Sequence, residues 1–151
     1  MSLILHCAVP NVNDRYTTDE LLQFLQSETN ELDFYRPIPR PGVIQSAAFD
    51  WSAVINLTAS SITIASILWI AYLKFIKPAL TAGNDQAELF IALDNDNDNS
   101  TSFVLSGAPI DKDSFIIEFS ETIETMRKDQ SVEESERIER KFRLSGHYKK
   151  L

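Results

Sequence analysis

The stretch from Trp51 to Leu73 contains no charged side chain, and it constrains the fold more than any other part of the sequence. As a helix with a rise of about 1.5 Å per residue, it is about 34 Å long, which is enough to cross the hydrocarbon core of a bilayer. We therefore predict one long apolar helix that begins between Gln45 and Asp50. We expect this helix to end near Ile76, because Pro78 cannot continue it.

Two interpretations of this helix remain open, a membrane span and a buried core helix. Trp51, Trp69 and Tyr72 lie near its ends, where the interfacial aromatic residues of membrane helices occur. At 100° per residue, however, its polar side chains gather on one stripe, which a single helix in lipid does not need. The stripe comprises Ser52, Asn56, Ser60 and Thr63, and the side chains expected inside the core include Leu57, Ile64 and Leu68. We favour the core helix, with a single-pass transmembrane helix over Trp51–Leu73 as the alternative.

The N-terminal residues predict a strand followed by a capped helix. Leu3 to Val9 is a short apolar run that is typical of a buried strand. Thr17 and Glu20 match a capping box, in which the threonine caps the helix and the glutamate reaches back to the threonine amide. We therefore expect a helix that begins at Thr17 and ends between Ser27 and Asn30.

Prolines at positions 37, 39 and 41 determine how the next segment can fold. Each proline lacks a donor amide, so residues 31–42 cannot form a helix or a central strand. We expect an extended sheet edge or a polyproline-like connector, anchored by Phe34 and Ile38.

The second half of the chain predicts a β-hairpin and an amphipathic helix. Gln86–Leu93 and Thr101–Ser106 look like two antiparallel strands joined by a polar loop. A helix should then begin between Asp111 and Ser114. Its apolar residues recur at three- and four-residue steps and should face a core; they are Phe115, Ile116, Phe119, Ile123 and Met126.

These elements predict an α+β fold, a small mixed domain with a long central apolar helix, a β-hairpin and a C-terminal amphipathic helix. We assign residues 1–128 to a single α+β domain. Residues 129–151 are almost wholly polar, with few apolar residues. We therefore expect them to form a charged tail that is partly helical or disordered.

Composition limits the partners of the chain. The formal net charge is −8 and the isoelectric point is near 4.7, so the overall field repels a polyanion and argues against nucleic acid. The single cysteine, Cys7, excludes an intramolecular disulfide. No basic N-terminal region of a signal peptide is present, which favours the cytoplasm. If Trp51–Leu73 crosses a bilayer, the location is instead the inner or plasma membrane.

Three alternating carboxylates, Asp94, Asp96 and Asp98, resemble the first ligands of a calcium-binding helix–loop–helix motif. The pattern then departs from that motif, because Asn99 stands where glycine is needed and Leu105 where a bidentate glutamate is needed. The sequence therefore leaves calcium binding undecided and favours a polar hairpin tip, so we assign no metal site.

Nucleophiles and bases form no catalytic pattern. His6 and Cys7 are adjacent on a predicted strand, so their side chains point to opposite faces. His147, the second of the two histidines, lies in the polar tail. The sequence contains neither a GxSxG motif nor a glycine-rich phosphate loop. We therefore assign no catalytic residue and no cofactor, and we expect a protein that is not an enzyme.

We expect a non-enzymatic, acidic protein-interaction module. An acidic surface complements a basic one, so one concrete form is an immunity or inhibitor protein that binds a basic partner protein. The alternative is a membrane-anchored effector or subunit with Trp51–Leu73 as its transmembrane helix. Homo-oligomers are compatible with either hypothesis.

Overall fold

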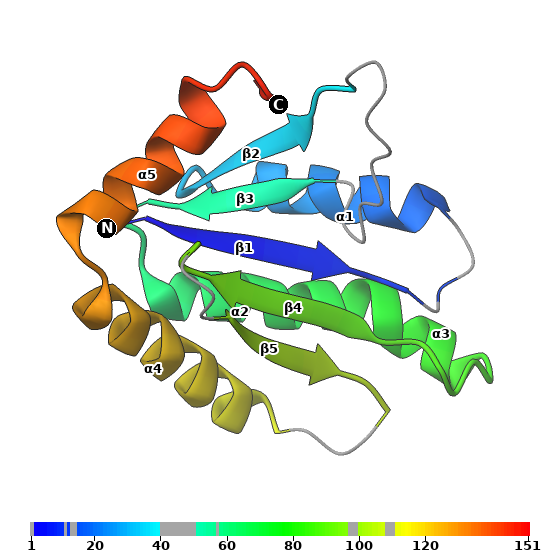
Figure 1. Ribbon diagram of the computed structural model, residues 1–151. Helices are drawn as coiled ribbons and strands as arrows, with labels where there is room; N and C mark the ends of the chain where they lie inside the picture. Colours follow the sequence, from blue (N-terminus) through cyan, green and yellow to red (C-terminus); the bar gives the residue numbers. More distant parts are fainter. Residues whose placement is uncertain are drawn as a thin grey trace.

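A six-stranded antiparallel sheet with helices on both faces forms the molecule (Figure 1). The computed structural model describes residues 2–10, 12, 15–39, 51–56, 58–96, 100–107 and 111–151. The strands are β1 (Leu3–Ala8), β2 (Leu32–Pro37), β3 (Ser52–Ile55), β4 (Leu89–Asp94), β5 (Ser100–Leu105) and β6 (Tyr148–Lys150). The helices are α1 (Arg15–Glu28), α2 (Ser61–Ala71), the π-helix η1 (Tyr72–Ile76), α3 (Lys77–Thr81), α4 (Lys112–Asp129) and α5 (Val132–Arg143). The predicted α+β class is confirmed.

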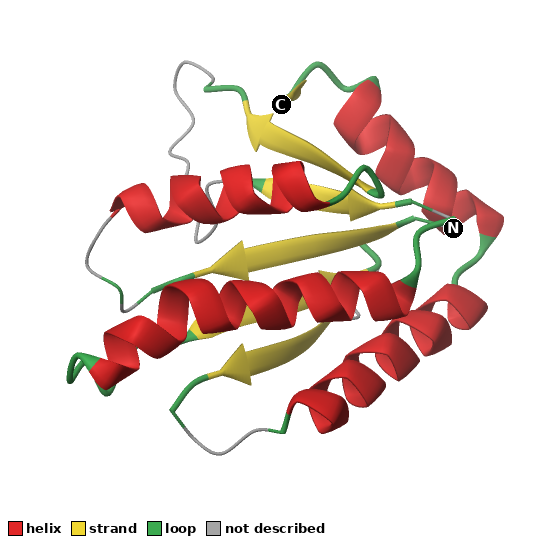
Figure 2. Ribbon diagram, turned by 180° about the vertical axis from the view of Figure 1, so that it is seen from behind, coloured by secondary structure: helices red, strands yellow, loops and turns green. Residues whose placement is uncertain are grey.

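The strand order is β5-β4-β1-β3-β2-β6, and every neighbouring pair is antiparallel. Side chains of a strand alternate between the two faces, so Leu3, Leu5 and Cys7 of β1 enter the main core. Helices α1, α2 and α4 cover that face, as Figure 2 shows from behind. The predicted strand at Leu3–Val9 and the predicted hairpin are therefore both present.

Helix α5 packs on the opposite face and makes a second, smaller core. Ile138 and Phe142 are buried there against Ile4, Tyr35 and Val54. Strand β6 then pairs with β2 at the edge of the sheet. Residues beyond 128 are partly helical, as expected, but they do not form a separate tail, because this region supplies a packed helix and a strand of the sheet. Two apolar side chains one helical turn apart suffice to dock α5 on a small apolar patch.

The charge-free stretch does not form one helix, and this prediction was wrong. Its first residues form β3, a central strand that pairs with β1 on one side and β2 on the other. Ser60 then caps α2, since its Oγ accepts a hydrogen bond from the Thr63 amide at 3.3 Å. A buried strand is followed, after a short connection, by a helix that buries one side in the main core, so burial explains part of the missing charge; Ile62 and Ile70 on the other side of the helix are exposed. Trp51 is fully buried and packs on Phe34, with ring centroids 5.6 Å apart.

The predicted polar stripe is therefore only partly helical. Ser52 lies in β3 and Asn56 precedes the helix, whereas Thr63 lies exposed on α2. Ile64 and Leu68 are buried, as predicted. Leu57 lies outside the described residues.

The apolar helix continues through Pro78 to Thr81, beyond the predicted end. A π-turn makes this continuation compatible with proline, since the Lys77 amide donates to the Tyr72 carbonyl five residues earlier. Among the described residues, one helix, Ser61–Thr81, is long and apolar enough to cross a membrane by length and composition. Of the most apolar 18-residue stretch of this helix, 39% is buried inside the fold.

The remaining local predictions were partly right. Helix α1 begins at Arg15, so Thr17 lies inside the helix and not at its cap. Residues 32–37 are extended as expected, but β6 pairs with them, so β2 is not the sheet edge. Phe34 is a buried anchor, whereas Ile38 is 39% exposed.

Helix α4 begins one residue after its cap, Asp111, whose Oδ2 accepts a hydrogen bond from the Ser114 amide at 3.2 Å. The predicted apolar stripe of this helix faces the core. Phe115, Phe119 and Ile123 are buried there, and Ile116 and Met126 pack against them.

Candidate functional site

Among the described residues of α2, η1 and α4, four large apolar side chains lie exposed. Ile62, Ile70 and Leu73 follow one side of α2 and η1 and are 60%, 47% and 40% exposed. Ile117 on α4 is 57% exposed. We call these four residues, with the groove beside Ile62, the helix-layer surface. Clusters of exposed apolar residues are typical of surfaces that bind another macromolecule.

A shallow groove of about 380 Å³ separates the first turn of α2 from α4. Its lining is Ser61, Ile62, Ser120, Glu121, Glu124, Thr125 and Lys128. Glu121 and Glu124 follow Ile117 at four and seven residues, so they lie on the same side of α4. The groove therefore combines an exposed isoleucine with two carboxylates and one ammonium group.

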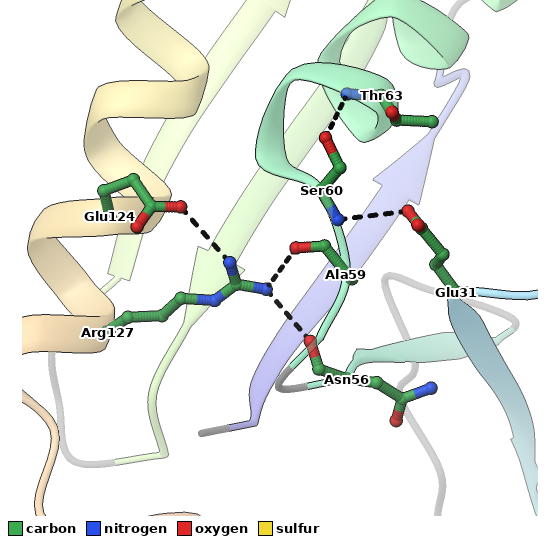
Figure 3. Close-up of polar contacts among 7 residues, drawn as sticks. All are labelled: Glu31, Asn56, Ala59, Ser60, Thr63, Glu124 and Arg127. Carbon is green, nitrogen blue, oxygen red and sulfur yellow. Dashed lines mark hydrogen bonds and ion pairs between the residues drawn. The ribbon is translucent and has the colours of Figure 1, made fainter.

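Arg127 joins α4 to the loop that leads into α2 (Figure 3). Its Nη2 donates to the carbonyl oxygens of Asn56 and Ala59 at 2.9 and 3.0 Å. Its Nη1 lies 3.2 Å from Oε1 of Glu124. The side chain is only 13% exposed. The Asn56 carbonyl also accepts a hydrogen bond from the Ala59 amide at 3.0 Å, so Arg127 reinforces a turn in the loop after β3. The guanidinium has several N–H donors, so Nη2 can contact both carbonyls while Nη1 faces the carboxylate.

Glu31 fixes the same loop from the other side (Figure 3). Its Oε2 accepts a hydrogen bond from the Ser60 amide at 3.2 Å, and Ser60 itself caps α2. The first amides of a helix have no intrahelical partner, so a carboxylate is favourable at this position. Sequence reasoning missed this contact, although serine before an apolar helix is a usual cap signal.

A polar cluster lies on the opposite face of the sheet, beside α5. Ser52 Oγ lies 3.1 Å from Nδ1 of His6, a residue pair that sequence reasoning missed because it placed Ser52 in a helix. Burial lowers the pKa of His6 below its ordinary value, while the Asp94 carboxylate raises it and the Lys141 ammonium lowers it. His6 is thus held as a neutral imidazole at neutral pH.

A serine beside a neutral histidine can in principle act as a nucleophile with its base. The nearby carboxylates make contacts within the hairpin of β4 and β5 and with α5. Asp94 Oδ1 accepts a hydrogen bond from the Asp96 amide at 2.7 Å, and Asp96 Oδ1 lies 3.0 Å from Lys141 Nζ. These contacts tie the tip of the hairpin to α5. They support a structural role for the cluster.

The three aspartates of the calcium hypothesis lie at the end of β4 and after it. Asp96 adopts a positive φ of 63°, as turn residues of this type do. Asp98 lies outside the described residues. Within the described part of the chain, no group of three or more His, Cys, Asp or Glu side chains could hold a metal ion.

Cys7 and the two histidines lie in different environments. Cys7 is 1% exposed in the main core, and burial raises the pKa of its thiol to about 12. His6 lies on the other face of β1, as predicted, where it contacts Ser52. His147 is exposed and precedes β6. A thiol that stays protonated in the core is not an activated nucleophile.

Comparison with protein-family models, curated proteins and solved structures finds no match to this chain. The function therefore has to be argued from the surfaces described above.

Proposed function

We propose that this protein is a non-enzymatic interaction module that binds a basic partner protein through the helix-layer surface. The observation that supports the proposal most directly is the groove beside Ile62, where a 60% exposed isoleucine lies next to Glu121 and Glu124. An apolar centre with charged groups at its rim is the usual anatomy of a protein interface.

The chemistry of the groove specifies the partner. An apolar side chain inserted beside Ile62 removes hydrocarbon surface from water on both molecules. Lysine or arginine residues at the edge of the same partner segment can pair with Glu121 and with the second carboxylate oxygen of Glu124, whose Oε1 faces Arg127. A helix with apolar residues on one side and basic residues beside them meets both requirements.

The overall charge of the chain supports the same kind of partner. A net charge of −8 attracts a basic protein over a distance and accelerates its encounter, and added salt screens this attraction. One form of this function is an immunity or inhibitor protein that covers the basic site of a toxin.

Replacing Ile62 by aspartate together with Glu121 by lysine should weaken binding by about 10- to 100-fold, since an apolar anchor and a complementary charge are both lost. Wild-type and variant chains are immobilised and exposed to native lysate. We expect a stoichiometric basic protein on the wild type that is lost from the variant.

Val132→Asp is the matched control for this experiment. Val132 is 63% exposed on α5, outside the helix-layer surface, so this variant should retain the partner. Equal capture by all three chains would contradict the assignment of the surface. Failure of the wild type to retain any stoichiometric protein would contradict the proposed function.

A second candidate function is that of a membrane-anchored subunit, which the length and apolarity of Ser61–Thr81 favour. Against it, buried residues of this helix such as Ile64 and Leu68 cover the main core, and insertion into lipid would uncover the sheet. We expect alkaline carbonate to release the chain from isolated membranes, because only integral proteins resist it. Retention in the membrane pellet would favour the anchored subunit.

A further inference from the structure

The two edges of the sheet differ in how they are protected. Strand β6 forms one edge and β5 the other (Figure 1). Strand β6 has three residues, and its Lys149 and Lys150 are exposed. Short length and lysine side chains are devices by which natural sheets prevent edge-to-edge association.

Strand β5 lacks these devices. It has six residues, Ser-Thr-Ser-Phe-Val-Leu, with neither a charge nor a proline. Its register with β4 runs without a bulge from Leu89↔Leu105 to Asp94↔Ser100. Among the described residues, no strand pairs with its outer side. A long, regular and uncharged edge presents unpaired amides and carbonyls that can bind another strand.

We propose that β5 pairs antiparallel with β5 of a second copy of this chain, so that one sheet continues through a two-fold dimer. This inference is independent of the proposed function, because it concerns a different part of the surface. An antiparallel strand paired with its own copy is self-complementary, so the assembly closes at two subunits.

The absence of charge on β5 favours a second copy of the chain as its partner, although the chain as a whole is acidic. Strand β5 has no carboxylate, so self-pairing places no like charges directly opposite one another, which would be destabilising. Pairing of β5 with β6 of another copy would instead build a ring or an open filament. The lysines and the short length of β6 oppose that arrangement.

The pairing geometry identifies the side chain that is buried. In an antiparallel pair, residues directly opposite one another point to the same face of the sheet. The two-fold axis that relates two copies of β5 therefore passes beside a residue and not between two residues. The longest pairing of the strand with its copy places this axis at Ser102 or Phe103. Either choice places Val104 opposite a serine of the second copy, Ser100 or Ser102. Val104 is 41% exposed in the single chain and points away from the side where Phe103 packs on α4. The dimer therefore covers an exposed valine with a small neighbour.

Val104→Lys tests the proposal, because it places a charge at the paired edge. Analytical ultracentrifugation of the wild type should show a mass rising from 17.1 kDa toward twice that value. The concentrations should extend to about 1 mM, the range of weak association. We expect Val104→Lys to dimerise at least about 10-fold more weakly and Val132→Lys, at a more exposed valine on α5, to match the wild type.

Hydrogen exchange identifies the contact directly. Amides of residues 100–105 should gain protection as the wild-type concentration rises, and this gain should be absent in Val104→Lys. Circular dichroism checks the fold of the variant, and Ser102→Lys replaces it if it fails to fold. A wild type that stays monomeric, a variant that dimerises like the wild type, or growth into filaments would each overturn the proposal.

Discussion

Replacing Phe119 by alanine should lower the free energy of unfolding by about 3–5 kcal/mol, the usual cost of removing a buried phenylalanine. Phe119 is 0% exposed. Its ring lies 5.2 Å from that of Phe103 on β5 and 5.5 Å from that of Phe115 on α4. The substitution would leave a cavity between the sheet and the helix, which the surrounding side chains fill only in part.

Ile117→Ala is the control on the same helix. Ile117 is 57% exposed, so its truncation should change the free energy of unfolding by no more than about 0.5 kcal/mol. Urea denaturation followed by circular dichroism measures both variants. Similar losses for Phe119→Ala and Ile117→Ala would contradict the packing of α4 on β5.

Local patterns predicted the elements whose signals are periodic. Helix α4 was predicted because Phe115, Phe119 and Ile123 repeat at helical spacing, and its start lies within the predicted range. The hairpin of β4 and β5 was found because a polar loop separates two strand-like runs. In both cases one side of the element is buried and the other faces water, so the sequence carries the period.

The charge-free stretch shows no regular alternation of buried and exposed residues. This explains why the prediction of one long helix over the stretch was wrong. Strand β3 is buried on both faces, with Ala53 and Ile55 toward the main core and Val54 under α5. A continuous apolar strand and a buried helix are not distinguishable by periodicity alone. The break between them is marked by Ser60, whose capping role depends on a helix that starts at that point.

The packing of α5 on the sheet was not predicted, for a different reason. Ile138 and Phe142 are too few to sustain a coiled coil, and the remainder of the segment is charged. The small apolar patch formed by Ile4, Tyr35 and Val54 requires no more than these two side chains. That patch exists only once β1, β2 and β3 are aligned, so the sequence of α5 alone does not reveal it.

The contact of Arg127 with the loop before α2 could not be predicted, because the residues it joins are distant in the sequence. Arg127 binds carbonyl groups 71 and 68 positions earlier in the chain. No pattern near Arg127 distinguishes it from the exposed arginines of α5. Its role follows from the antiparallel approach of the end of α4 to the start of α2.

Replacing Arg127 by alanine should lower the free energy of unfolding by about 2–4 kcal/mol, because two hydrogen bonds from a charged donor are lost and the carbonyl of the buried Ala59 loses this partner. The Asn56 and Ala59 carbonyls lose the partner that holds the entry to α2. Amides in the first turn of α2 should then exchange faster with solvent, since local opening becomes easier. Urea denaturation and hydrogen exchange measure the two effects.

Arg140→Ala is the matched control for the Arg127 substitution. Arg140 also lies near a helical glutamate, with Nη2 3.4 Å from Glu136 Oε2, but it is 71% exposed. Exposed pairs of this kind contribute at most about 1 kcal/mol, so Arg140→Ala should be nearly neutral. Arg127→Lys separates charge from geometry, because lysine keeps the charge but has one nitrogen where arginine places Nη2 on the two carbonyls and Nη1 on Glu124. A stability of Arg127→Lys equal to that of the wild type would contradict a role for the guanidinium geometry. Loss of the same magnitude in Arg140→Ala would show that charge alone, and not the buried contact, stabilises this part of the fold.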